Sequence, residues 1–152
     1  LLTLNKHIKA GFLDSSSEER ALERAVRRFD IRARDASVAV GRLSGGNQQK
    51  LMLGKTMESE PDIIIMDEPT RGIDVGTKQQ IYHIIAALAA EGKSIILISS
   101  EMQEVIGLSH RVVVMREGRL TGVLEGAEIT EAEIMRYAAG IKQSGNDERI
   151  SA

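Results

Sequence analysis

Two short apolar runs, separated by one helix-length segment, constrain the fold of this sequence most strongly. Residues 63–66 (IIIM) and 94–99 (SIILIS) are typical of strands that are buried on both faces. Asp74 can cap a helix between them and Gly92 can end it, and this helix has one apolar stripe: Ile81, Ile84, Ile85 and Leu88. Strands that alternate with helices indicate a parallel sheet. We therefore predict an α/β fold with a mostly parallel sheet.

The N-terminal side of the sequence predicts helices without strands between them. A first helix is expected over about residues 16–30, and a second from Ser44 to about Glu58, ended by Pro61. Capping boxes at the start of the first helix pair Ser15 with Glu18 and Ser16 with Glu19. Because no strand separates the two helices, we expect a small helical lobe on this side.

The C-terminal third predicts a short helix, a hairpin and a last helix. The stretch EMQEVIGL is helical in pattern, and residues 111–115 and 119–126 read as strands joined by a turn at Glu117–Gly118. Thr130 caps a helix through about Ala139. The predicted organisation is one domain over 1–139, divided into a helical part, 1–60, and an α/β core, 61–139, followed by a flexible tail, 140–152.

Composition excludes several classes of protein. The 152 residues suit one domain, and the 42% hydrophobic and 28% charged content is ordinary for a globular chain. A net charge of −2 shows no basic footprint for nucleic acid. The absence of cysteine excludes a disulfide scaffold and a thiolate metal site. No apolar run approaches the roughly 20 residues of a membrane span, and no secretion signal is visible.

An acidic pair follows the first apolar run, in the stretch IIIMDEP. Carboxylates at the carboxyl end of a buried parallel strand lie where open α/β sheets bind ligands. Adjacent acids are costly there unless a cation or a proton offsets them. In phosphoryl transfer Asp67 would hold Mg²⁺ and Glu68 would orient or deprotonate the attacking water. The alternative is that both acids end the strand in a solvated turn, with Pro69 stopping the sheet.

A glycine pair opens the second predicted helix, in the stretch LSGGNQQK. Gly45 and Gly46 allow backbone N–H groups to approach an anion, and the helix start attracts negative charge. Ser44 adds a hydroxyl donor. The alternative is a glycine-rich turn with Ser44 as an ordinary N-cap.

Together these stretches resemble the ATP-binding cassette of ABC transporters. LSGGNQQK looks like the signature motif, IIIMDEP like the Walker B strand with its catalytic glutamate, and RGID like the D-loop. ILISSE falls where the switch-histidine segment is expected. The four motifs occur in the family's order between about residues 40 and 125. Their amino-acid sequences look closest to those of the second cassette in the two-cassette ATPases of bacterial ribose- and galactose-type importers. The resemblance implies the C-terminal portion of an ABC-type P-loop NTPase cassette.

The resemblance also implies roles for single residues. In this family two cassettes pair head to tail, and the signature of one closes over the ATP held by the P-loop of the other. The implied nucleotide-binding residues are Ser44, Gly45, Gly46, Asn47 and Gln48; the implied metal and catalytic residues are Asp67 (Mg²⁺, directly or through water), Glu68 (water activation), Asp74 (D-loop) and Ser100 (switch-histidine position).

The sequence departs from the family pattern at two points. No stretch matches G-x-x-x-x-G-K-[ST], so the first strands and the P-loop are missing. Gly54–Lys55–Thr56 and Gly92–Lys93–Ser94 carry only its last letters, and both lysines are expected to be solvated. Ser100 replaces the switch histidine and cannot carry a positive charge. The expected result is an asymmetric pair in which this half completes the site on its partner while its own site is slow.

The expected parent protein is an ABC-type ATPase that drives import of a monosaccharide, with ATP and Mg²⁺ as cofactors. Its implied partners are a second cassette, membrane-spanning permease subunits and, indirectly, a periplasmic sugar-binding protein; its implied place is the cytoplasmic face of the inner membrane. One alternative is an inactive, truncated cassette that self-associates through exposed apolar surface. The other is an ATPase of the SMC type that maintains DNA, although the sequence shows no sustained heptads or basic stripe.

Overall fold

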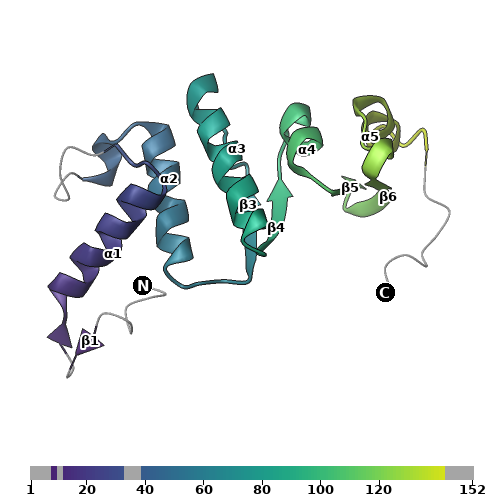
Figure 1. Cartoon of the computed structure of the whole chain (residues 1–152). Coiled ribbons are helices and arrows are strands. Elements are labelled where there is room, and N and C mark those ends of the chain that lie inside the picture. Colours follow the sequence, from purple (N-terminus) through teal and green to yellow (C-terminus); the bar gives the residue numbers. More distant parts are fainter. Residues whose placement is uncertain (1–7, 10–11, 33–38, 143–152) are drawn as a thin grey trace. The chain divides into compact units, whose positions relative to one another are not determined.

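The computed structural model describes residues 8–9, 12–32 and 39–142 of the chain (Figure 1). The chain divides into two compact units, Leu1–Ile96 and Leu97–Ala152. In the described part, no helix combines the length and the apolarity that a membrane crossing requires. The predicted tail falls largely on residues 143–152, outside the described residues.

The first helix, α1 (Ser15–Arg28), follows a short antiparallel pair of strands, β1 (Ile8–Lys9) and β2 (Phe12–Leu13). The carboxylate of Asp14 caps α1 by accepting hydrogen bonds from the backbone N–H groups of Ser16 and Ser17, at 3.1 and 3.3 Å. The predicted capping boxes at Ser15 and Ser16 are therefore wrong. A single carboxylate one position earlier takes both N–H groups, so these serines lie inside the first turn.

The second helix, α2 (Gly45–Met57), follows a 3₁₀ turn, η2 (Val40–Arg42), and packs against α1. Gly54 permits this contact, because a Cβ on it would lie 2.9 Å from the Cβ of Ala25 and 3.3 Å from Cδ2 of Phe29. The two helices form the small helical lobe that the sequence predicts. The stretch Gly54–Lys55–Thr56 lies inside α2, as expected for a sequence that only imitates the end of a P-loop.

The predicted strand–helix–strand unit is present as β3 (Ile63–Asp67), α3 (Val75–Ala90) and β4 (Ser94–Ile98). Asp74 caps α3 as predicted, and Gly92, with φ of 87°, follows its end. The apolar stripe of α3 supplies the buried residues of this helix. Its buried members are Ile81, Ile85 and Leu88.

The strand β3 is buried on one face only. Ile64 and Met66 are 3% and 5% exposed, whereas Ile63 and Ile65 are 62% and 67% exposed. Ile96 of β4 is also half exposed. The prediction of strands buried on both faces is therefore wrong for this chain, because the described residues cover a single face of β3.

The described strands form three two-stranded sheets, β1–β2, β3–β4 and β5–β6. The first and third are antiparallel. The α/β class is confirmed, but the expected mostly parallel sheet is not formed by the described strands. Each sheet has only two members, and in each sheet these are consecutive strands of the chain.

The second unit contains α4 (Met102–Leu108), β5 (Arg111–Arg116), β6 (Arg119–Glu125), a 3₁₀ turn η3 (Gly126–Glu128) and α5 (Glu131–Ala138). The hairpin turns at Glu117 and Gly118, with φ of 49° and 74°, as predicted. Thr130 caps α5 by accepting a hydrogen bond from the N–H of Glu133. The core of this unit joins the hairpin to α5 through Val112, Val114, Leu124, Ile134 and Tyr137.

Candidate functional site

The LSGGNQQK turn presents the start of α2 to solvent. Ser44 is the N-cap residue, with extended backbone angles of −60° and 153°, and its side chain is exposed. Its hydroxyl makes no hydrogen bond to the first-turn N–H groups. The N–H groups of the first turn therefore donate no hydrogen bond to a capping side chain, and the positive end of the helix dipole lies at this turn. Such a helix start suits an anion.

Asn47 and Gln48 use their amide groups within the chain. The Oδ1 atom of Asn47 accepts a hydrogen bond from the backbone N–H of Arg32 at 2.8 Å, and its Nδ2 donates to Oγ of Ser44 at 2.9 Å. Nε2 of Gln48 donates to the carbonyl of Leu43 at 2.9 Å. The sequence predicts both as nucleotide-binding residues, and this stays a prediction; in the structure their amide groups make hydrogen bonds within the chain. No pattern along the sequence marked Arg32 as their neighbour.

The RGID turn lies against the glycine pair within the first unit. A Cβ on Gly45 would lie 4.0 Å from the carbonyl oxygen of Gly72. Gly46 is buried, and a Cβ on it would overlap the Cγ2 methyl of Thr77. The structure therefore brings together the two turns that the sequence places apart. It also adds Thr77, which sequence reasoning did not single out.

Asp74 is tied to Thr77 at the start of α3. Its carboxylate accepts hydrogen bonds from the N–H of Thr77 at 3.0 Å and from its Oγ1 at 2.7 Å. The side-chain hydrogen bond and then the backbone hydrogen bond from Thr77 lower the pKa of Asp74 below its ordinary value of 3.8. Asp74 is thus a charged helix cap beside the glycine pair. A short Asp-x-x-Thr pattern was the available signal for this pairing.

The acidic pair stands at the end of β3. Asp67 is the last residue of the strand and is exposed, and Glu68 is half-buried with a left-handed φ of 47°. Pro69 and Thr70 behind it are buried. Three other non-glycine residues of the described chain share a positive φ, but they end helices or form the hairpin turn: Asp30, Glu60 and Glu117. Glu68 differs from them because it follows a strand that leads to α3 and not into a hairpin turn, and such backbone strain is often found at functional sites.

Ser100 belongs to the second unit and lies between β4 and α4, where it is exposed. The N–H of the next residue, Glu101, donates to Oγ of Ser99 at 3.0 Å. The position predicted from the switch-histidine segment therefore lies in a turn after a strand. The remaining predicted site residues all lie in the first unit.

The residues at the acidic pair fit a metal ion only in part. Among the described residues, no group of three or more His, Cys, Asp or Glu side chains is placed to hold one. Mg²⁺ is commonly bound by one or two carboxylates, with water and phosphate oxygens completing its six positions. The exposed carboxylate of Asp67 fits one such position, and the ion would supply positive charge to the phosphates.

The lysines that imitate a P-loop make other contacts or none. Lys55 is exposed as predicted, whereas Nζ of Lys93 lies 3.5 Å from Oδ1 of Asp62. Lys50, at the end of the LSGGNQQK stretch, is 2% exposed, and its Nζ donates to the carbonyl of Asp30 at 2.9 Å. This lysine fastens α2 to the end of α1.

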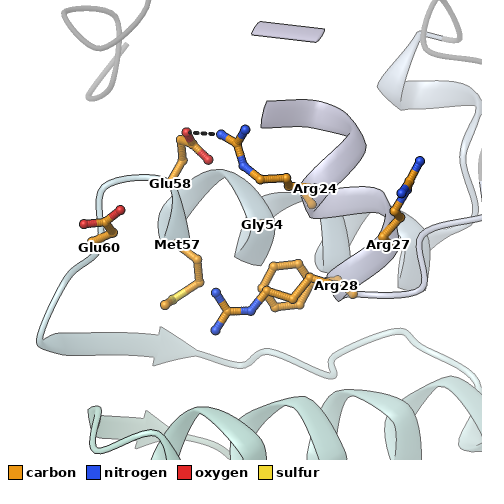
Figure 2. A pocket seen from close by; sticks show the side chains of 9 residues that line it. Arg24, Arg27, Arg28, Gly54, Met57, Glu58 and Glu60 are labelled. Atoms are coloured by element: carbon orange, nitrogen blue, oxygen red, sulfur yellow. Dashed lines mark hydrogen bonds and ion pairs between the residues drawn. The ribbon is translucent and has the colours of Figure 1, made fainter. Parts of the chain in front are cut away.

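A separate groove lies between α1 and the C-terminal end of α2 (Figure 2). Apolar atoms of Phe29 and Met57 line it, and Arg24 pairs with Glu58 at its edge, at 3.1 Å. None of the predicted site residues is among its lining residues. The groove therefore does not belong to the candidate site.

Comparisons with known proteins support the resemblance. The family model described as ABC transporter matches residues 2–71. The chain is 46% identical over 140 residues to the ribose import ATP-binding protein of Agrobacterium fabrum, which covers 92% of the chain and 28% of that relative. It is 47% identical over 136 residues to the galactose/methyl galactoside import ATP-binding protein of Clostridium tetani, with 89% and 27% covered. The chain thus spans little more than a quarter of the length of these relatives.

Solved structures show the same fold. An ATP-binding cassette of an ABC transporter matches with a TM-score of 0.71 and 22% identity, covering 93% of this chain and 55% of that one. A cassette dimer bound to ADP and Pi matches with a TM-score of 0.66 and 19% identity, covering 77% and 50%. By sequence, the chain is therefore similar to the C-terminal part of sugar import ATP-binding proteins of the ABC transporter type, and its fold is that of part of an ATP-binding cassette.

Proposed function

We propose that the chain provides the signature motif of an ATP-hydrolysing subunit that energises import of a monosaccharide. The observation that carries this proposal is the start of α2, where Ser44 and Gly45 are exposed and no side chain caps the helix, in a chain similar to two sugar import ATP-binding proteins. The sugar class follows from the names of these relatives, which import ribose and galactose. ATP is the cofactor.

The signature turn completes an ATP site on a second cassette. The hydroxyl of Ser44 and the first N–H groups of α2 would contact the terminal phosphate of an ATP molecule held by the P-loop of that cassette. In this division of labour the P-loop belongs to the second cassette, and the signature turn belongs to this chain. The geometry at Gly72 and Asp74 supports it as well, since the D-loop turn lies beside the glycine pair.

The acidic pair, Asp67 and Glu68, belongs to a second ATP site, on this chain's own side, which we propose to be the slower of the two. In the proposal Asp67 helps hold Mg²⁺, directly or through water, and the strained Glu68 orients the attacking water. Asp74 and Ser100 complete the D-loop and switch positions. Because Ser100 lacks the charge of a histidine, we propose that this side of the pair turns over slowly.

The proposed partners follow from the same assignment. The second cassette is the direct one, and membrane-spanning permease subunits and a periplasmic sugar-binding protein complete the importer. The chain would then lie at the cytoplasmic face of the inner membrane, attached through its partners. The proposal includes no nucleic-acid partner, and the net charge of −2 is consistent with this because nucleic-acid-binding proteins usually carry a positively charged surface.

The test is a titration of a non-hydrolysable ATP analogue with Mg²⁺ into a cassette that carries a P-loop, alone and with saturating chain. The proposal predicts that the wild-type chain tightens binding by about tenfold or more, as expected for hydrogen bonds to a charged group. The Ser44→Ala variant removes most of this gain, while Ser59→Ala, an exposed serine after α2, keeps it.

Two results would overturn the proposal. Binding of the analogue to the chain alone would contradict the absence of its own phosphate cradle. No gain with the wild-type chain would favour the inactive, truncated cassette instead. A third titration, with duplex DNA at low and high salt, tests the DNA-maintenance alternative, since phosphate contacts give strongly salt-dependent affinity.

A further inference from the structure

A chain of hydrogen bonds runs from Arg32, in the segment after α1, to the hydroxyl of Ser44. The backbone N–H of Arg32 donates to Oδ1 of Asn47 at 2.8 Å. Nδ2 of Asn47 then donates to Oγ of Ser44 at 2.9 Å. Arg32 and Asn47 are 15 positions apart, so this connection joins the segment after α1 to the first turn of α2.

The orientation of the Asn47 amide is determined by Arg32. A backbone N–H can only donate, so the atom of Asn47 that faces it must be the carbonyl oxygen. The amide nitrogen therefore faces Ser44 and donates to it. The direction of both hydrogen bonds follows from this one constraint.

This direction leaves the proton of Ser44 available. A hydroxyl that accepts a hydrogen bond keeps its own O–H free to donate, and chains of hydrogen bonds polarise one another. Within the described residues, Oγ of Ser44 has Asn47 as its side-chain partner and donates to no acceptor. Its remaining donor is thus free for a group that comes from outside the chain.

We infer that Asn47 is a positioning residue that acts on ATP through Ser44. It holds the hydroxyl of Ser44 as an acceptor, so that the hydroxyl donates outward to the terminal phosphate, and it links that hydroxyl to the backbone of Arg32. The contact of Ser44 with a phosphate rests on the proposed function. The hydrogen bonds from Arg32 through Asn47 to Ser44 are observed in the structure and do not depend on it. The inference assigns Asn47 a role different from that of a phosphate ligand, which the sequence resemblance implies.

The test is a double-mutant cycle with Asn47→Leu and Ser44→Ala, read out by the same analogue titration with a P-loop cassette. Asn47→Leu keeps a similar size but removes both hydrogen bonds, and we expect it to weaken the gain in affinity about three- to tenfold. In the Ser44→Ala background the same change should have an effect of less than about twofold, because interacting residues are not additive. A direct phosphate ligand would instead give additive effects, which would overturn the inference.

Backbone amide exchange provides a readout that does not depend on ATP. Asn47→Leu should speed exchange of the Arg32 N–H about tenfold, whereas Ser44→Ala should leave it within about twofold. Asn47→Gln keeps a donor and an acceptor and should restore part of the affinity. Thr56→Val is the control on α2, since it removes a hydroxyl that donates only to the carbonyl of Met52; it should change neither readout.

The outcomes separate this inference from the proposed function. If the wild-type chain gives no gain in affinity, the proposed function fails whatever the exchange data show, and the role of Asn47 toward ATP fails with it. If the gain is present and lost in Ser44→Ala, but Asn47→Leu has no effect or adds fully to Ser44→Ala, only the inference fails. Unchanged exchange at Arg32 in Asn47→Leu also overturns it.

Discussion

The Cγ2 methyl of Thr77 occupies the space that a Cβ on Gly46 would fill. Thr77 also donates to Asp74 through both its N–H and its hydroxyl. One residue of α3 therefore contacts the second glycine of the signature turn and fixes the aspartate of the RGID turn. The two turns form one packed unit in which a change at either residue affects the other.

Gly46→Ala should destabilise the chain. Overpacking costs about 1–3 kcal/mol, and the better helix propensity of alanine offsets up to about 1 kcal/mol, so we expect a net loss of about 1–2 kcal/mol. Gly45→Ala is the matched control, because a Cβ on Gly45 would lie 4.0 Å from the carbonyl oxygen of Gly72, which is an ordinary contact. Urea unfolding followed by circular dichroism measures both. Equal stability of the two variants would contradict the packing argument.

Asp74 should stabilise the chain in a pH-dependent way. Its pKa is lowered by the hydrogen bonds from Thr77, so the unfolded chain binds the proton more readily than the folded one. The stabilisation is fully present above the ordinary pKa of 3.8 and is lost as the pH falls through the lower folded value. The difference in unfolding free energy between wild type and Asp74→Ala should therefore shrink below about pH 4.

Thr77→Val provides the matching control for that cap. The variant keeps the shape of the side chain but removes the hydroxyl, so the pKa of Asp74 should move up toward 3.8. Carboxyl chemical shifts followed by NMR during an acid titration measure this directly. A pKa of Asp74 that stays unchanged in Thr77→Val would show that the hydroxyl is not the main cause.

Most local features of the fold could be predicted from the sequence, although the capping boxes at Ser15 and Ser16 are wrong, whereas features that depend on distant residues could not be predicted. The caps at Asp74 and Thr130 and the turn at Glu117–Gly118 depend on neighbours within a few positions, and the structure confirms them. The exposure of Ile63 and Ile65 depends on what covers the sheet. The sequence of an apolar strand does not show which other residues pack against each of its two faces.

The candidate site shows the same division. Ser44, the glycine pair and the acidic pair stand out in sequence because glycine and adjacent carboxylates are costly without a reason. The contacts of Thr77 with Gly46 and of Arg32 with Asn47 join separate elements, and no spacing rule along the chain reveals them. Tertiary packing therefore determines which polar atoms of the signature turn remain free.

The exposed isoleucines of β3 should cause self-association of the isolated chain. Ile63 and Ile65 place two large apolar side chains on the uncovered face, at 62% and 67% exposure. Replacing both with threonine keeps the β-branched shape and should lower the mass measured by light scattering. Ile64→Thr, at a position only 3% exposed, should instead lower stability by about 1–3 kcal/mol. A wild-type chain that is monomeric at high concentration would contradict this prediction.

Lys50 should be required for the junction between α1 and α2. Its Nζ donates to the carbonyl of Asp30 and lies 3.7 Å from the carboxylate of the same residue. Lys50→Met keeps most of the buried chain but leaves that carbonyl without its donor, so we expect a loss of about 1–3 kcal/mol. Lys55→Met, at an exposed position of the same helix, is the control and should change stability by less than about 0.5 kcal/mol.

The proposed asymmetry predicts a ranking of two variants in the steady-state ATPase activity of the paired cassettes. Ser44→Ala removes a donor to the phosphate of the competent site and should lower the rate about 10- to 100-fold. Glu68→Gln affects the site on this chain's own side, where Ser100 replaces the switch histidine, and should lower the rate less than about threefold. Ser59→Ala controls for the loss of a hydroxyl beyond the end of α2. A larger loss in Glu68→Gln than in Ser44→Ala would show that the site on this chain's side is the active one.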